Sequence, residues 1–186
     1  MTPTDCIYDP EGIRLDVVKD IKLRRRGRIR EYAQLVPGSE FRSDFRDLWS
    51  VPCDVALPCA TQNELDVEDA VMIVANNVRY YVEAANMPAT AEALRLLRLS
   101  PKILTAGSKA SGSGGVVVSA LEMVQNSLRY SWTRQEVDSR LKQIMGGIYD
   151  ASAAAAEEYG LGYDLIAGND IAAFKKISTA MIAQGL

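Results

Sequence analysis

Residues 55–63 read Val-Ala-Leu-Pro-Cys-Ala-Thr-Gln-Asn, a short apolar run that ends in small and polar residues. A helical pattern follows this stretch, with its N-cap expected near Asp66. Its predicted inner face carries Val67, Ala70, Val71 and Val74. An apolar run, a polar turn and a helix in that order are typical of a β-α unit, so the stretch predicts one strand of a parallel sheet.

The same order occurs twice more along the chain. Strand-like residues 80–82 lead into residues 86–88 (Asn-Met-Pro) and a helix from about Thr90, whose inner positions are Leu94 and Leu97. Strand-like residues 103–105 lead into a glycine-rich stretch and a helix that starts near Val116. Three successive units of this kind predict an α/β fold with a parallel sheet.

Further helical patterns flank the three units. Before them, residues 11–26 carry Ile13, Val17 and Ile21 on one face. After them, Thr133 and Glu136 can form a capping box, and the helix they start is expected to end near Gly160. A last helix is expected from near Asn169 to a C-cap at Gly185, with an inner face of Ile171, Phe174, Ile177 and Met181.

Composition narrows the class of protein. The chain has 186 residues, of which 48% are hydrophobic and 24% charged, with a net charge of -3 and no histidine. This profile is typical of a globular protein and predicts neither nucleic acid nor a membrane as partner. The lack of histidine excludes serine-histidine triads and most zinc sites, so no metal site is expected. Three cysteines without a signal-peptide pattern favour reduced thiols and a cytoplasmic location.

Polar side chains follow each predicted strand. The carboxyl ends of parallel strands meet at one edge of a sheet, where helix N-termini and free loop amides converge on ligands. We therefore expect a ligand crevice along one rim, formed by Thr61, Gln62, Asn86, Ser108, Lys109 and Ser119.

The glycine-rich stretch, residues 107–115, has the composition of a phosphate-binding loop. Its spacing matches neither a P-loop nor a dinucleotide fingerprint, whose third glycine would stand where Val117 does. We interpret it as a flexible loop before a helix that starts near Val116. The free amides of that helix, with Ser119 in its first turn, can bind a carboxylate.

Two other features have a plain structural interpretation and a functional alternative. The basic residues between Lys22 and Arg30 are interpreted as a solvated helix end, and contact with nucleic acid or with the extra phosphate of NADP is the alternative. Cys53 and Cys59 lack a second ligand pair nearby, so we expect buried small side chains rather than a metal site.

Three long phrases carry a resemblance to a known family. Residues 53–65 (CDVALPCATQNEL), 83–88 (EAANMP) and 114–127 (GGVVVSALEMVQNS) resemble, in order, the cofactor-domain signatures of hexameric NADP-type glutamate dehydrogenases. Shorter matches at residues 8–13, 131–133 and 171–185 extend the resemblance over essentially the whole chain.

The resemblance implies a fold and a division into domains. The expected fold is a partial doubly wound, Rossmann-like parallel sheet that lacks its first strands and is followed by C-terminal helices. Residues 1–165 would be the C-terminal part of the dinucleotide-binding domain. Residues 166–186 would form a helix that packs back on the substrate domain.

The resemblance also implies a function. The family interconverts L-glutamate and 2-oxoglutarate plus ammonia, with NADP as the expected cofactor, NAD as the alternative, and a homo-hexamer as the assembly. Ser119 would help to bind the side-chain carboxylate of the substrate, and Val116 would line its pocket. The positions along the nicotinamide and its ribose would be Ala60, Thr61, Gln62 and Asn86.

Departures from the family pattern lead to a second expectation. The catalytic lysines and aspartate of the family belong to an N-terminal substrate domain, so no catalytic residue is assigned here and the isolated chain is expected to be inactive. Ala84 replaces a usual glycine, and Ser111-Gly112-Ser113 replace an Ala-Asn-Ala stretch. The competing hypothesis is a non-catalytic fragment or split-gene subunit that docks on a partner chain through an open sheet edge.

Overall fold

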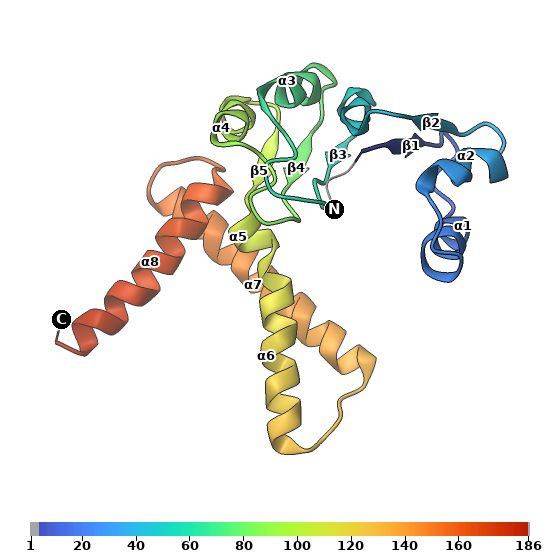
Figure 1. The fold of residues 1–186 in the computed structure, drawn as a ribbon. Coiled ribbons are helices and arrows are strands. Elements are labelled where there is room, and N and C mark those ends of the chain that lie inside the picture. Colours follow the sequence, from blue (N-terminus) through green and yellow to red (C-terminus); the bar gives the residue numbers. More distant parts are fainter. Residues whose placement is uncertain (1–3, 186) are drawn as a thin grey trace.

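The computed structural model describes residues 4–185, so Met1–Pro3 and Leu186 lie outside the described residues. A three-stranded parallel sheet and a two-stranded antiparallel sheet organise the chain (Figure 1). In the parallel sheet, β3 (Val55–Ala56), β4 (Tyr80–Val82) and β5 (Leu104–Ala106) lie in the order β3-β4-β5. The α/β class and the parallel sheet expected from the sequence are therefore confirmed.

The strand boundaries differ slightly from those predicted. The middle strand has the predicted bounds, whereas the last begins one residue later than expected, at Leu104. β3 has two residues instead of the predicted run 55–59. Because Pro58 has no backbone N–H to donate, it is a poor continuation of a strand in a ladder.

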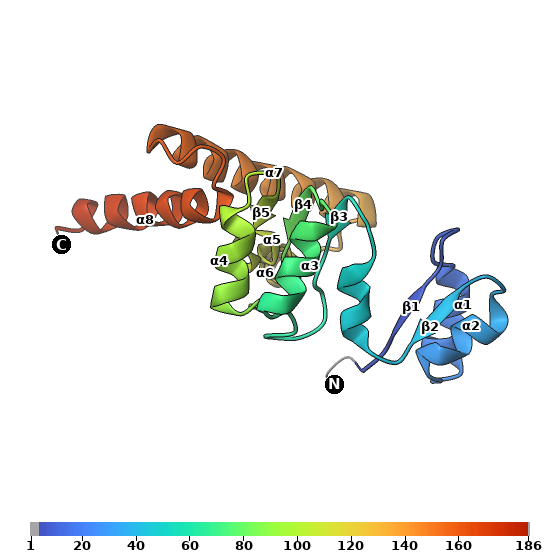
Figure 2. The ribbon, with the colours of Figure 1, turned by 90° about the horizontal axis from the view of Figure 1, so that it is seen from above.

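Two helices with side-chain caps pack side by side over one face of the parallel sheet (Figure 2). α3 (Val67–Ala75) begins after Asp66, whose carboxylate accepts the N–H groups of Glu68 and Asp69. α4 (Ala91–Leu99) begins after Thr90, whose hydroxyl accepts the N–H of Ala93. Both starts agree with the sequence prediction. A cap residue and the amides it accepts from lie within three positions of each other, so the cap can be recognised in the local sequence.

The main core lies between these two helices and the sheet. The face of α3 that is buried in this core is only partly the predicted one. Ala70 and Ile73 are buried, while Val67 and Val71 are 40% and 51% exposed. The sheet covers a narrower stripe of the helix than four apolar positions require. The buried residues of this core are Trp49, Ala56, Leu65, Ala70, Ile73, Val78, Tyr81, Ala89, Ala93, Leu97 and Ile103.

The glycine-rich stretch is helical rather than a flexible loop. It contains α5 (Ser108–Ser111), and α6 (Ser113–Leu128) follows after Gly112 alone. The predicted helix start near Val116 is therefore wrong by one turn. α6 extends away from the sheet and returns through a loop into α7 (Arg134–Glu158), so that the two helices form a hairpin (Figure 1).

α8 (Leu165–Ala183) begins after the cap Asp164, four residues earlier than the predicted start near Asn169. It packs on α7 through small residues rather than through the predicted apolar face. At Gly168 an added Cβ would lie 2.0 Å from the carbonyl oxygen of Ser152, so the two backbones touch at this point. The predicted inner residues Phe174, Ile177 and Met181 are 69%, 60% and 45% exposed. Beyond the crossing point the helix diverges from the rest of the chain, which leaves these side chains uncovered (Figure 1).

The N-terminal part forms its own small unit, which the sequence analysis missed except for one helix. β1 (Cys6–Tyr8) pairs antiparallel with β2 (Glu40–Arg42), and η3 (Phe45–Ser50) leads on to the parallel sheet. Between the two strands lie α1 (Leu15–Lys19), the π-helical turn η1 (Asp20–Arg24), η2 (Ile29–Glu31) and α2 (Tyr32–Leu35).

The predicted helix 11–26 is thus shorter at both ends and changes character in its second half. Ile21 is fully buried against Tyr32 and Val36, as an inner position should be, but Ile13 is 42% exposed. Ile13 precedes the helix, whose N-cap Arg14 has an extended backbone, so helical spacing does not apply to Ile13.

Three further findings concern special sites. Cys53 and Cys59 are exposed thiols, contrary to the expected burial. Among residues 4–185, no three cysteine, aspartate or glutamate side chains cluster in a way that could hold a metal ion. None of the helices in that range is both long and apolar enough to cross a membrane.

Candidate functional site

The loops that follow β3 and β4 are joined by backbone hydrogen bonds. The carbonyl of Pro58 accepts the N–H groups of Ala84 and Ala85 at 3.1 and 3.0 Å. Further along, the N–H of Asn63 donates to the carbonyl of Met87 at 3.0 Å. Residues 58–65 and 83–90 therefore run side by side beyond the carboxyl ends of the two strands.

Both loops turn at a residue in the left-handed region. Asn63 has φ of 53° and Met87 has φ of 50°, and these two residues are the donor and acceptor of the bond that joins the loops. Asparagine tolerates this conformation well, whereas methionine does not, so the bond helps to hold Met87 in place. Asn86 precedes Met87 directly, and its position is set by the same turn.

The four predicted cofactor contacts lie in these paired loops. Ala60, Gln62 and Asn86 are exposed and Thr61 is half-buried, so none lies beneath the packed core. Within the first loop, the buried carboxylate of Glu64 accepts the N–H of Ala60 at 3.0 Å. The sequence analysis did not assign Glu64, although an acidic residue inside an otherwise apolar and amide-rich run was a usable signal.

A second buried carboxylate connects the loop after β4 with α5. Glu83 is 2% exposed, and it accepts the N–H of Ser108 at 2.9 Å and the hydroxyl of Tyr81 at 3.3 Å. The hydroxyl of Ser111 donates to the backbone carbonyl of Glu83. Burial, together with the nearby carboxylates of Glu83 and Glu64, raises the pKa of Tyr81 well above its ordinary value, so Tyr81 stays a neutral donor.

The two predicted substrate contacts lie on α6. Val116 is 72% exposed and Ser119 is exposed. Because α6 begins at Ser113 after the N-cap Gly112, the amides without a partner inside this helix belong to residues 113–115, and the placement of Ser119 in the first turn is wrong. Ser119 lies six residues after the start of the helix. Its hydroxyl is exposed there, but it is more than one turn away from the free amides at the helix start.

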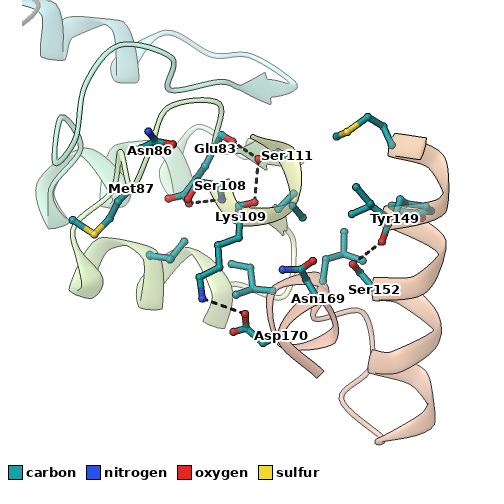
Figure 3. A pocket seen from close by; sticks show the side chains of 18 residues that line it. Glu83, Asn86, Met87, Ser108, Lys109, Ser111, Tyr149, Ser152, Asn169 and Asp170 are labelled. Atoms are coloured by element: carbon teal, nitrogen blue, oxygen red, sulfur yellow. Dashed lines mark hydrogen bonds and ion pairs between the residues drawn. The ribbon is translucent and has the colours of Figure 1, made fainter. Parts of the chain in front are cut away.

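A cavity of about 610 Å³ opens beside this rim, between the loop after β4, α5, α7 and α8 (Figure 3). Of the predicted rim residues, Asn86, Ser108 and Lys109 line it, whereas Thr61, Gln62 and Ser119 do not. The ammonium group of Lys109 on α5 pairs with Asp170 on α8 at 3.3 Å. The apolar part of its wall consists of Met87, Leu94, Ala106, Ala110, Met145, Ile148, Leu165 and Ile166.

The chemistry of the site is that of binding and orientation. The loop residues offer a hydroxyl and two uncharged amides, and α6 offers free backbone N–H groups near its start. The buried acid at the rim, Glu83, is engaged in two hydrogen bonds, and Asp170 is paired with Lys109. These groups suit a polar ligand with an attached carboxylate, and they do not include a free general base.

Comparison with known proteins agrees with this geometry. Residues 2–185 match the family model described as Glutamate/Leucine/Phenylalanine/Valine dehydrogenase. An NAD-specific glutamate dehydrogenase of Clostridium symbiosum is 49% identical over 99% of this chain and 41% of its own length. An NADP-specific glutamate dehydrogenase of Helicobacter pylori strain J99 is 41% identical over 97% of this chain and 41% of its own.

Solved structures give the same result. A glutamate dehydrogenase structure superposes with a TM-score of 0.91 at 49% identity, covering 100% of this chain and 42% of the other. The chain therefore spans about two fifths of the length of the proteins that it matches.

Proposed function

The chain belongs to the glutamate/leucine/phenylalanine/valine dehydrogenase family, and from this premise we propose that it supplies the nicotinamide-binding part of a glutamate dehydrogenase. The whole enzyme would interconvert L-glutamate and 2-oxoglutarate plus ammonia in the cytoplasm. The observation that carries the proposal is the pairing of the loops after β3 and β4, which brings the segment of Thr61 and Gln62 next to that of Asn86.

The residues present suit a nicotinamide and its ribose. A carboxamide and sugar hydroxyls need uncharged donors and acceptors, and the paired loops provide the hydroxyl of Thr61 with the amides of Gln62 and Asn86. In the proposal, these side chains and the backbone at Ala60 hold the ring in one orientation. The cofactor, once bound, supplies the hydride chemistry.

The substrate would lie toward the start of α6. In the proposal, the hydroxyl of Ser119 donates to the side-chain carboxylate of the substrate. Val116, at 72% exposure, offers apolar contact to the methylene groups of the substrate. No residue of this chain is proposed to move a proton during the reaction.

We propose NADP as cofactor and keep NAD as the alternative, since the relatives named above include one specific for each. The assembly is proposed to be a homo-hexamer. The exposed apolar side chains of α8 support a protein contact, because Phe174, Ile177 and Ile182 are 69%, 60% and 73% exposed. In the proposed division, residues 166–186 contact the substrate domain and residues 1–165 belong to the cofactor domain.

The experiment is a reconstitution. The 186-residue chain is mixed with the separately produced part of the Clostridium symbiosum relative that this chain does not match, which includes the substrate domain and the first part of the cofactor domain in the proposed division. Oxidation of NADPH or NADH is then followed with 2-oxoglutarate and ammonium. We expect no turnover by either part alone and turnover by the mixture. Turnover by this chain alone contradicts the proposal that its residues only bind and orient.

A second function is favoured by one specific observation. β3 is paired on one side only among residues 4–185, and Val55 and Leu57 beside that open edge are 46% and 52% exposed. An apolar open edge invites strand pairing with another chain. We therefore keep, as the alternative, a non-catalytic subunit that docks on a partner. A mixture that forms a stable complex but lacks turnover, although the supplied part of the relative is natively folded, would support it.

A further inference from the structure

A second pocket, of about 540 Å³, opens at the other end of the parallel sheet. It lies where β4 and β5 begin, whereas the paired loops lie where β3 and β4 end. Its wall includes the residues before and at the start of β5, the last turn of α4 and the loop between α7 and α8. The pocket is therefore separate from the proposed nicotinamide site.

Three basic side chains line this pocket, each from a different segment. Arg79 precedes β4, Arg98 lies in the last turn of α4, and Lys102 lies in the loop before β5. The one carboxylate in the wall, Asp164, is neutralised by Arg98 at 2.6 Å. Within residues 4–185, Arg79 and Lys102 have no carboxylate partner, so the pocket carries two uncompensated positive charges in a chain of net charge -3.

The pocket also contains hydroxyl and aromatic groups. Ser100 also lines the pocket, and the buried Thr105, 7% exposed, has a hydroxyl without a hydrogen-bond partner in the described part of the chain. The ammonium group of Lys102 donates to the neutral amide oxygen of Asn77 at 3.5 Å and keeps its charge uncompensated. The guanidinium of Arg79 lies 5.5 Å from the centre of the Tyr80 ring, within cation–π distance. Tyr163, 55% exposed, lines the pocket with its ring, while its hydroxyl is hydrogen-bonded to that of Tyr149.

We propose that this pocket binds a small phosphomonoester. A guanidinium, an ammonium and hydroxyl donors form the set that recognises a phosphate group, and two free positive charges match its dianionic form. The volume exceeds that of a phosphate and falls in the range of small-molecule sites, so the organic part would lie against Tyr163 and Leu161. The inference does not depend on the proposed dehydrogenase function.

The test is a calorimetric titration of the 186-residue chain at fixed ionic strength. The probes are ribose 5-phosphate, adenosine 5′-monophosphate and inorganic phosphate, with chloride as the salt control. We expect binding of at least one ester more tightly than inorganic phosphate. An equal response to chloride, or no binding by either ester, overturns the proposal. If inorganic phosphate binds as tightly as both esters, the proposed contact of the organic group with Tyr163 and Leu161 is wrong.

Variants separate the pocket from general charge effects. Arg79→Gln and Lys102→Gln are each expected to raise the dissociation constant of the ester at least tenfold. Lys142→Gln, at an exposed position on α7, serves as the matched control and should leave it unchanged. Thr105→Val removes a buried hydroxyl without a partner, so it should raise the thermal unfolding midpoint of the chain without ligand. It should also reduce the increase in this midpoint that the ester produces. Equal loss of binding in all three charge variants contradicts a specific site.

Discussion

The carboxylate of Glu83 accepts the backbone N–H of Ser108 at 2.9 Å, which ties the end of β4 to the first residue of α5. Because α5 leads into α6 after Gly112, this bond also determines where the start of α6 lies relative to Asn86. A buried carboxylate that makes such a bond is costly to remove, since its donors lose a partner away from water.

Glu83→Ala is therefore expected to lower the free energy of unfolding by about 2–3 kcal/mol. Glu83→Gln should cost less than about 1 kcal/mol, because its carbonyl can accept from Ser108 and its amide can donate to Tyr81. Urea unfolding measures both variants, and hydrogen exchange at Ser108 reports the local bond. Equal losses in the two variants would show that the bond to Ser108 is not the stabilising contact.

Gly168 is expected to tolerate no side chain. In Gly168→Ala the new Cβ would lie 2.0 Å from the carbonyl oxygen of Ser152, so α8 must move off α7. We expect a loss of more than about 2 kcal/mol in unfolding free energy. The matched control is Gly147→Ala, inside α7 with open space at its Cβ, which should stabilise by about 0.5–1 kcal/mol. Thermal unfolding distinguishes a loss from a gain.

Asn86→Ala and Ser119→Ala are expected to weaken the binding of different ligands in the reconstituted enzyme. Loss of one hydrogen bond to the cofactor or to the substrate carboxylate should cost about tenfold in kcat/KM. Asn86→Ala should raise the KM for the nicotinamide cofactor, and Ser119→Ala the KM for 2-oxoglutarate. Ser127→Ala, exposed near the other end of α6, is the control. A rise in the same KM for both variants would contradict the separate roles.

The pH dependence of stability should include a contribution from Asp164. Burial alone would raise its pKa, but hydrogen bonds from Arg98 and from the N–H of Ala167 lower the pKa below the ordinary value of 3.8. A depressed folded-state pKa contributes stability above the unfolded-state pKa, and this contribution is lost as pH falls through the folded-state value. The group therefore stabilises the fold at neutral pH.

Asp164→Asn is accordingly expected to lower the unfolding free energy by about 1 kcal/mol at pH 7, because the amide still caps α8 but no longer pairs with Arg98. The difference from the unchanged chain should shrink toward zero below pH 3.8. Asp138→Asn, at an exposed position on α7, is the control and should show little difference at either pH. A difference that persists at low pH would exclude the charge of Asp164 as its cause.

Local patterns were enough to predict the β-α units and the capped starts of three helices. Asp66 and Thr90 cap α3 and α4, and Thr133 with Glu136 forms the capping box of α7. Such signals depend on side chains that meet backbone groups within a few positions, so the sequence contains them directly. The order of polar loops after the strands likewise predicted that the segments of Thr61 and Asn86 would lie on one rim.

Other features depend on contacts between distant residues, and the sequence analysis missed them. β1 and β2 pair across more than thirty intervening residues, with Ile7 opposite Phe41. The cavity that holds Asn86, Ser108 and Lys109 exists because α7 and α8 pack beside α5. The functional roles of the predicted site residues remain predictions for the experiments above.

The sequence by itself determined the α/β class, the caps and the family, since each is written in short runs of neighbouring residues. Only the tertiary structure decided which apolar residues are covered. Phe174, Ile177 and Met181 have the spacing of an inner face, yet they are exposed because α8 touches α7 through Gly168 and diverges beyond it. Periodicity states which side chains share a face of a helix, but burial depends on whether another part of the fold reaches that face.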